Sequence, residues 1–173
     1  MKLNKNCIFL FLFCIVLYGA FLGTIPLLDP DEPVYGETAK EMIATGDFLS
    51  PRIYGEFWYD KPPLFYWLEA LSFSLFGVST WAARFPSLFL GALTPVYLYL
   101  SSRKLIGGKA ALRGAFICAT SLEIIVLARS SVTDTLLTLT LTIALMSFLR
   151  KEYIVAYIFC GLALLTKGPV GFG

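Results

Sequence analysis

The stretch that decides the fold runs from Asp29 to Pro63 and reads DPDEPVYGETAKEMIATGDFLSPRIYGEFWYDKPP. It lies between apolar segments, yet it holds most of the acidic residues of the chain. Charged groups beside a bilayer cost little only where they reach water or a partner. We therefore expect this stretch to be a loop that a membrane protein keeps outside the bilayer.

The composition of the whole chain also indicates a membrane protein. Of its 173 residues, 57% are hydrophobic and 15% are charged, whereas a soluble domain has about 25% charged residues. No histidine is present, so acid–base chemistry falls to carboxylates, lysine or tyrosine. The four cysteines lie within apolar runs and form no CxxC pair, which favours buried thiols. No basic patch of the kind that binds nucleic acid is visible, and no such partner is expected.

The positions of the basic residues predict the topology. Basic residues without acids at 101–113, and again at 150–151, are typical of cytoplasmic segments, as is the lysine-containing amino terminus. We therefore predict an all-α integral membrane protein with a long first extracytoplasmic loop. The expected spans are about 7–28, 81–100, 114–127, 135–149 and 153–165, and the loop covers 29–80.

Two helices are expected within this external loop. Asp31 is a good cap for a helix from about Glu32 to Thr45, and Gly46 is a good stop. The loop is expected to be irregular and rich in aromatic rings from there to Asp60. An apolar helix at 63–76 is short for a span, and an even number of crossings must separate two cytoplasmic segments, so it is predicted to lie in the interface.

Two motifs of the loop resemble a known family. Asp31 to Glu37 reads DEPVYGE, and Tyr59 to Pro63 reads YDKPP. Together they resemble the first external loop of the GT-C glycosyltransferases, in the group that contains the lipid A aminoarabinose transferases and the protein O-mannosyltransferases. The resemblance continues weakly through Asp134 and Lys167 and covers the amino-terminal part of that family. Aminoarabinose transferases have an arginine where this chain has Val34, which favours a broader sugar transferase.

This resemblance implies a function. The protein would move a sugar from a polyprenyl-phosphate donor to an acceptor at the extracytoplasmic side of a bacterial inner membrane, with inversion at the anomeric carbon. Membrane lipid would be its other partner. Non-catalytic alternatives are a multispan scaffold and a transporter subunit. We expect the chain to be the amino-terminal part of a longer protein, with truncated, split and complete gene products all left open.

The candidate site residues gather at one predicted membrane face. The resemblance matches Asp31 to a catalytic or metal-associated carboxylate, Lys61 to a lysine near the donor phosphate, and Asp134 to an acid across the same cavity. The full set is Asp31 and Glu32 as catalytic groups, Lys61, Arg84 and Lys167 for the donor phosphate, and Tyr35, Asp60, Arg129 and Asp134 in support. A divalent metal on Asp31 is the one cofactor considered.

Each of these assignments has a purely structural alternative. Asp31 and Asp134 are placed to cap helices, and Glu32 to favour the positive end of a helix dipole. Lys61 can extend from the interface or pair only with its neighbour Asp60. The two arginines, Arg84 and Arg129, can simply mark the ends of spans. Tyr35 can pack against other side chains.

Overall fold

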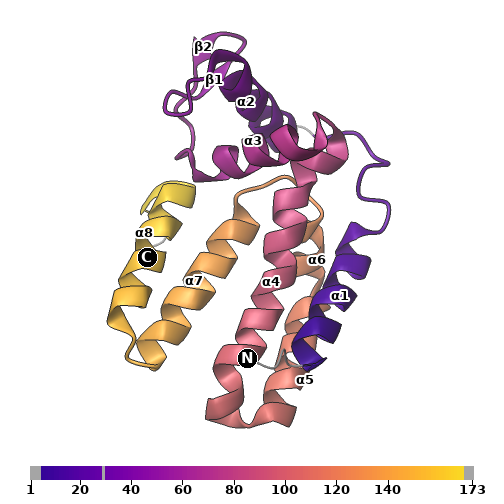
Figure 1. The fold of residues 1–173 in the computed structure, drawn as a ribbon, viewed down its shortest axis with the longest axis vertical. Helices are drawn as coiled ribbons and strands as arrows, with labels where there is room; N and C mark the ends of the chain where they lie inside the picture. The colour runs from indigo at the N-terminus through magenta and orange to yellow at the C-terminus, as the bar shows by residue number, and fades with distance from the viewer. Residues whose placement is uncertain (1–4, 29, 170–173) are drawn as a thin grey trace.

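The computed structural model describes residues 5–28 and 30–169, which form helices joined by short connections and one small hairpin. Its elements are α1 (Lys5–Gly19), α2 (Asp31–Thr45), β1 (Arg52–Ile53), β2 (Glu56–Phe57), α3 (Leu64–Phe76), α4 (Thr80–Ile106), α5 (Gly108–Ala119), α6 (Leu122–Ala128), α7 (Asp134–Leu149) and α8 (Tyr153–Lys167). Figure 1 shows a bundle of α1 and α4 to α8, with α2, α3 and the hairpin lying across one end of it. We call these last three elements the cap.

The first helix of the cap starts differently from the expectation. The residue before α2 is Pro30, and no side chain caps the helix. The prediction that Asp31 is the N-cap residue of α2 was therefore wrong, because Asp31 is already the first residue of the helix. An acid in this first turn still interacts favourably with the positive end of the helix. The helix ends as predicted at Gly46, whose φ of 71° is easily adopted by glycine.

The segment after α2 contains a hairpin rather than only irregular chain. Arg52 pairs with Phe57 and Ile53 with Glu56 in antiparallel register. The two residues between the strands, Tyr54 and Gly55, have φ values of 54° and 83°, which suit the tight turns that match the twist of a hairpin. The Arg52 guanidinium lies 4.2 Å from the centre of the Phe57 ring, an arrangement that favours this pairing.

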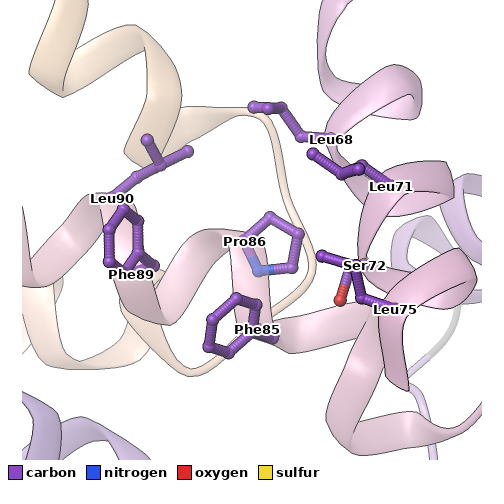
Figure 2. Close-up of a pocket in the computed structure, with 8 residues that line it drawn as sticks. All are labelled: Leu68, Leu71, Ser72, Leu75, Phe85, Pro86, Phe89 and Leu90. Atoms are coloured by element: carbon purple, nitrogen blue, oxygen red, sulfur yellow. The ribbon is translucent and has the colours of Figure 1, made fainter. Parts of the chain in front are cut away.

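A serine on α3 compensates for a proline inside α4. Pro86 has no N–H, so the carbonyl of Ala82 one turn earlier loses its usual helical donor. The buried hydroxyl of Ser72 donates a 2.6 Å hydrogen bond to this carbonyl. The second cap helix is thereby attached to the first part of α4. Beside this contact, α3 and α4 leave an apolar groove lined by leucine, phenylalanine and proline side chains (Figure 2).

The expected spans correspond to helices, with two corrections. The first apolar run is helical only to Gly19, after which the chain turns toward the cap. The run expected as one helix at 114–127 is instead the pair α5 and α6, bent by 61°. Among the described residues, only this bent pair has the length and apolar composition for a bilayer crossing, and no single helix does. The number of spans therefore stays a prediction.

A further correction concerns the start of α7. Asp134 was expected to cap a helix beginning at Thr135, but the helix begins at Asp134 and no side chain caps it. The helix predicted at 153–165 is α8, which ends at Lys167. The chain runs away from the cap in α7 and returns in α8, so the start of α7 and the end of α8 both lie on the cap side of the bundle (Figure 1).

Candidate functional site

The first candidate residue, Asp31, is an acid without a bonded partner. It is exposed in the first turn of α2, and its carboxylate makes no hydrogen bond or ion pair with another described residue. Its charge nevertheless acts on the ammonium group of Lys61 and on the hydroxyl of Tyr35. The two ends of the segment from Asp31 to Lys61 are therefore within electrostatic range of each other.

Lys61 is held in its charged form by the acids around it. Its Nζ lies 2.8 Å from Oδ2 of Asp60, as the structural alternative expected, and both side chains are partly exposed. This hydrogen bond raises the pKa of Lys61, burial opposes the rise, and the charges of Asp60 and Asp31 add to it. Lys61 is therefore a cation at neutral pH and remains open to a further anion.

Tyr35 lies beneath this charged pair and joins the two cap helices. Its ring is buried against Phe65 and Tyr66, with centroid distances of 5.6 and 5.8 Å. Burial raises the pKa of Tyr35, so its hydroxyl stays protonated at neutral pH. The structure thus gives this residue the packing position that the sequence offered as an alternative.

A second charged pair joins the end of α8 to the start of α7. Lys167 Nζ lies 2.6 Å from Asp134 Oδ1, and both side chains are about one third exposed. The sequence predicted these two residues at one membrane face without pairing them. The structure shows that they form an ion pair, so Lys167 already has an acidic partner.

Glu32 and Arg84 form a buried, two-point ion pair. Arg84 Nε lies 2.8 Å from one carboxylate oxygen of Glu32, and Nη2 lies 2.7 Å from the other. Both side chains are 5% exposed or less. Burial alone would raise the pKa of Glu32, but hydrogen bonds from Arg84 and from the N–H groups of Leu28 and Ser131 outweigh it and lower the pKa. Glu32 is therefore ionised and fully engaged.

The remaining N–H groups of Arg84 bind the backbone of the segment between α1 and α2. They donate to the carbonyl oxygens of Leu22, Ile25 and Pro26, each at 2.9 Å. A guanidinium has five N–H groups, and Arg84 uses all of them within the chain. In this arrangement the arginine has no donor left for a phosphate. Its contacts hold α2 and the segment between α1 and α2, which we call the linker, against α4.

Arg129 has a comparable role at the other side of the linker. Its Nη1 donates to the carbonyl oxygens of Tyr18 and Ala20, both at 2.8 Å. The last carbonyls of a helix lack helical donors and carry partial negative charge. The arginine that follows α6 thus satisfies the end of α1 and fixes these two helices together.

Residues 60–172 match the profile of the dolichyl-phosphate-mannose-protein mannosyltransferases. That range includes Lys61, Asp134 and Lys167 and covers more than half of the chain. The chain belongs to this family.

Individual relatives agree with the family assignment. A protein of Aeromonas hydrophila named undecaprenyl phosphate-alpha-4-amino-4-deoxy-L-arabinose arabinosyl transferase is 32% identical over 91% of this chain and 31% of its own length. An uncharacterised protein of Aquifex aeolicus is 36% identical over 91% of the chain and 33% of its own length. This chain therefore spans about a third of the length of these family members.

A solved structure resembles the fold closely. It is the crystal structure of ArnT from Cupriavidus metallidurans bound to undecaprenyl phosphate, with a TM-score of 0.88 and 26% identity. The match covers 98% of this chain and 34% of that protein. The resemblance to GT-C glycosyltransferases that the two loop motifs indicated is thus confirmed.

A divalent metal on Asp31 stays a prediction. Among the described residues, no three histidine, cysteine, aspartate or glutamate side chains converge closely enough to hold an ion. Asp29, two positions before Asp31, lies outside the described residues.

Sequence reasoning missed two residues that the structure connects to the site. Glu69, an acid in the middle of an apolar helix, and Ser131 were both absent from the predicted site residues. The hydroxyl of Ser131 donates a 2.6 Å hydrogen bond to Glu69, which is completely buried. The buried acid had a detectable signal, because charged residues are rare in apolar helices. No feature of the sequence pointed to Ser131.

Proposed function

We propose that this chain forms part of the active site of a membrane glycosyltransferase that uses a polyprenyl-phosphate sugar. The observation that carries the proposal is the carboxylate of Asp31, which has no bonded partner among the described residues and lies within electrostatic range of the Lys61 ammonium. A base and a cation near each other are what transfer from a sugar phosphate to a hydroxyl needs. The ArnT relative that binds undecaprenyl phosphate supports this donor class.

In the proposed reaction, Asp31 accepts the proton of the acceptor hydroxyl. The acceptor oxygen attacks the anomeric carbon while the bond from that carbon to the phosphate oxygen breaks. The polyprenyl phosphate leaves with the bonding electrons, and Lys61 neutralises part of its charge. The existing pair of Lys61 with Asp60 is partly exposed, and such pairs contribute about 0–1 kcal/mol, so a phosphate competes with it easily. Lys167, at the end of α8, offers a second cation once its contact to Asp134 rearranges.

We assign the other charged candidates to support of this site. Glu32 and Arg84 hold the linker and α2 in place, and Arg129 holds α1. This differs from the sequence-based expectation that Glu32 is catalytic and Arg84 binds the donor phosphate. The reason is that both groups are buried and their polar atoms are used by one another and by the backbone.

The groove between α3 and α4 suits the hydrocarbon part of a lipid. It has a volume of about 240 Å³ and is lined by Leu68, Leu71, Ser72, Leu75, Phe85, Pro86, Phe89 and Leu90 (Figure 2). It lies along the helix that follows Lys61, so a lipid with its phosphate at that lysine has an apolar surface nearby. We propose that the site faces the extracytoplasmic side of the inner membrane.

The experiment compares transfer from a polyprenyl-phosphate sugar by the purified natural protein and two variants. Asp31→Asn removes the proton-accepting charge and should lower turnover by roughly 10²-fold or more. Glu37→Gln is the matched control, since Glu37 lies on the same helix and binds only Lys40 in the described chain. Equal turnover by both variants would contradict the proposed base. Absence of transfer and of donor binding in the natural protein would favour a scaffold instead.

A further inference from the structure

Glu69 is an acid that the proposed chemistry does not use. It lies in the middle of α3 and has no solvent exposure. One oxygen, Oε1, accepts the hydrogen bond from Ser131 Oγ at 2.6 Å. The other, Oε2, has no partner among the described residues.

No cation in the described chain is available to neutralise this carboxylate. The helices packed against α3 are α2, α4 and α8. Of their cations, Lys40 of α2 binds Glu37, Lys167 of α8 binds Asp134, and Arg84 of α4 uses every N–H on Glu32 and the linker. The other two cations of α4, Arg103 and Lys104, lie in its last turn, at the end away from the cap. Since an ionised carboxylate buried without a partner is very costly, Glu69 is expected to carry a proton. Burial raises the pKa of Glu69 to about 8, and the charge of Glu32 contributes to the rise while Ser131 opposes it.

Ser131 donates hydrogen bonds to two different carboxyl groups. Its backbone N–H donates to Glu32 Oε1 at 2.6 Å, and its hydroxyl donates to Glu69 Oε1 at 2.6 Å. The two carboxyl groups come from α2 and α3, while Ser131 belongs to the segment between α6 and α7. Three residues after Ser131 the chain reaches Asp134, the first residue of α7.

We propose that Glu69 is a positioning residue, a neutral carboxylic acid that holds Ser131 and thereby places Asp134 relative to α2. Glu32, which holds the same serine through its backbone, directly follows Asp31 in the chain. The spacing between the two acids of the candidate site is therefore set through one serine and two buried carboxyl groups. The consequence for catalysis rests on the proposed function, whereas the placement of the 129–134 segment does not.

A neutral carboxylic acid and an ionised one respond oppositely to replacement by glutamine. Glutamine keeps the carbonyl oxygen that accepts from Ser131 and carries no charge, so it imitates the protonated acid. It also cannot ionise, whereas burial raises the pKa of Glu69 from 4.5 to about 8. Between these two values the buried acid keeps its proton and the opened segment releases it, so opening becomes easier as the pH rises. Protection should therefore fall between pH 6 and pH 8 and level off above that, in the wild type alone.

The test is hydrogen exchange of the backbone amides at 129–135 in the purified natural protein, corrected for intrinsic rates, between pH 6 and pH 9. Variants are Glu69→Gln, Glu69→Ala and Ser131→Ala. Ser74→Ala is the matched control, because Ser74 lies on the same helix and bonds only within it. A second readout is the pH profile of sugar transfer.

We expect Glu69→Gln to retain protection and to lack the decline in protection that the wild type shows between pH 6 and pH 8. Glu69→Ala and Ser131→Ala should each increase exchange of this segment by about tenfold, because a buried polar group loses its partner.

Equal loss of protection in Glu69→Gln and Glu69→Ala would overturn the proposal, since it would show an ionised Glu69. Unchanged protection in both Glu69→Ala and Ser131→Ala would overturn it as well. If Glu69→Ala fails to fold, Glu69→Gln and Ser131→Ala decide the matter. If exchange follows the expectation but no variant transfers sugar, the proposed function fails and the positioning role stands.

Discussion

The ammonium group of Lys167 lies 2.6 Å from the carboxylate of Asp134, so the last residue of α8 binds the first residue of α7. The two residues are 33 positions apart and share the cap side of the bundle. Both are partly exposed, which leaves the lysine accessible to an anion. The pair thus resembles Asp60 and Lys61 in chemistry, with one acid beside one lysine.

Replacing Lys167 should affect the donor more than the fold. A partly exposed ion pair stabilises a protein by about 0–1 kcal/mol, so Lys167→Ala should unfold at nearly the wild-type temperature. A lost hydrogen bond to a charged phosphate should raise the KM for the lipid-phosphate donor by roughly tenfold or more. Steady-state transfer kinetics with the donor varied would measure this. A large loss of stability at unchanged KM would assign the lysine a structural role only.

Breaking the buried pair of Glu32 and Arg84 should destabilise the protein strongly. Removing one partner of such a pair costs about 3–5 kcal/mol, because the other is left buried and unpaired. Arg84→Met alone should therefore unfold at a much lower temperature or denaturant concentration. The double variant with Glu32→Gln should recover part of this loss. Equal stability of the single and double variants would contradict the coupling.

The same pair gives stability a defined dependence on pH. The folded protein lowers the pKa of Glu32 below its ordinary value of 4.5, because Arg84 and two backbone N–H groups bind the carboxylate. A carboxyl group with a lowered pKa releases its proton more readily when folded, so its contribution is complete above about pH 4.5 and is lost as the pH falls through the lowered value. Denaturation at pH 3 and pH 6 should show this loss in the wild type. The Glu32→Gln/Arg84→Met variant should lack that part of the acid sensitivity.

Gly91 should tolerate no side chain, because α4 and α6 approach closely there. A Cβ at this position would lie 2.6 Å from the Cβ of Ala128, well inside van der Waals contact. Gly91→Ala should destabilise the protein by about 1–3 kcal/mol through overpacking. Gly114→Ala is the control, since a Cβ there meets no atom within 4 Å. Thermal unfolding in detergent compares them, and equal melting temperatures would mean that the two helices separate without cost.

The topology can be tested by chemical labelling. With the four native cysteines replaced by alanine, Glu56→Cys in the exposed hairpin should react with a membrane-impermeant thiol reagent in intact cells. Lys109→Cys, in the basic segment at the other end of the bundle, should react only after the membrane is broken open. The reverse pattern would invert the predicted orientation of the site.

Local features of this chain could be predicted from sequence because their physical causes are local. Gly46 ends α2 since glycine adopts a positive φ without strain. The helix after Pro63 and the helix at 153–167 follow from uninterrupted apolar runs between turn residues. The motifs around Asp31 and Lys61 indicated the family because their residues match the two ends of its first external loop.

Other local features depended on alternatives of nearly equal energy. The start of α2 falls one residue earlier than expected, so Asp31 lies in the first turn of the helix rather than at its cap position. The break between α5 and α6 interrupts a run that looks continuous in apolar composition. Neither the start of α2 nor the break between α5 and α6 can be recognised from amino-acid composition, since each depends on a single hydrogen bond or bend.

The sequence by itself determined which residues carry charge, that most of the acids lie in one stretch between apolar segments, and which family the chain resembles. Only the tertiary structure decided what each charge does. Glu32 and Arg84 are 52 positions apart, and Glu69 and Ser131 are 62 apart. A side chain's partner is set by the packing of whole helices, so no local pattern distinguishes the buried acids at 32 and 69 from the exposed acid at 31. The free carboxylate of Asp31 is recognised only once the partners of the other acids are known.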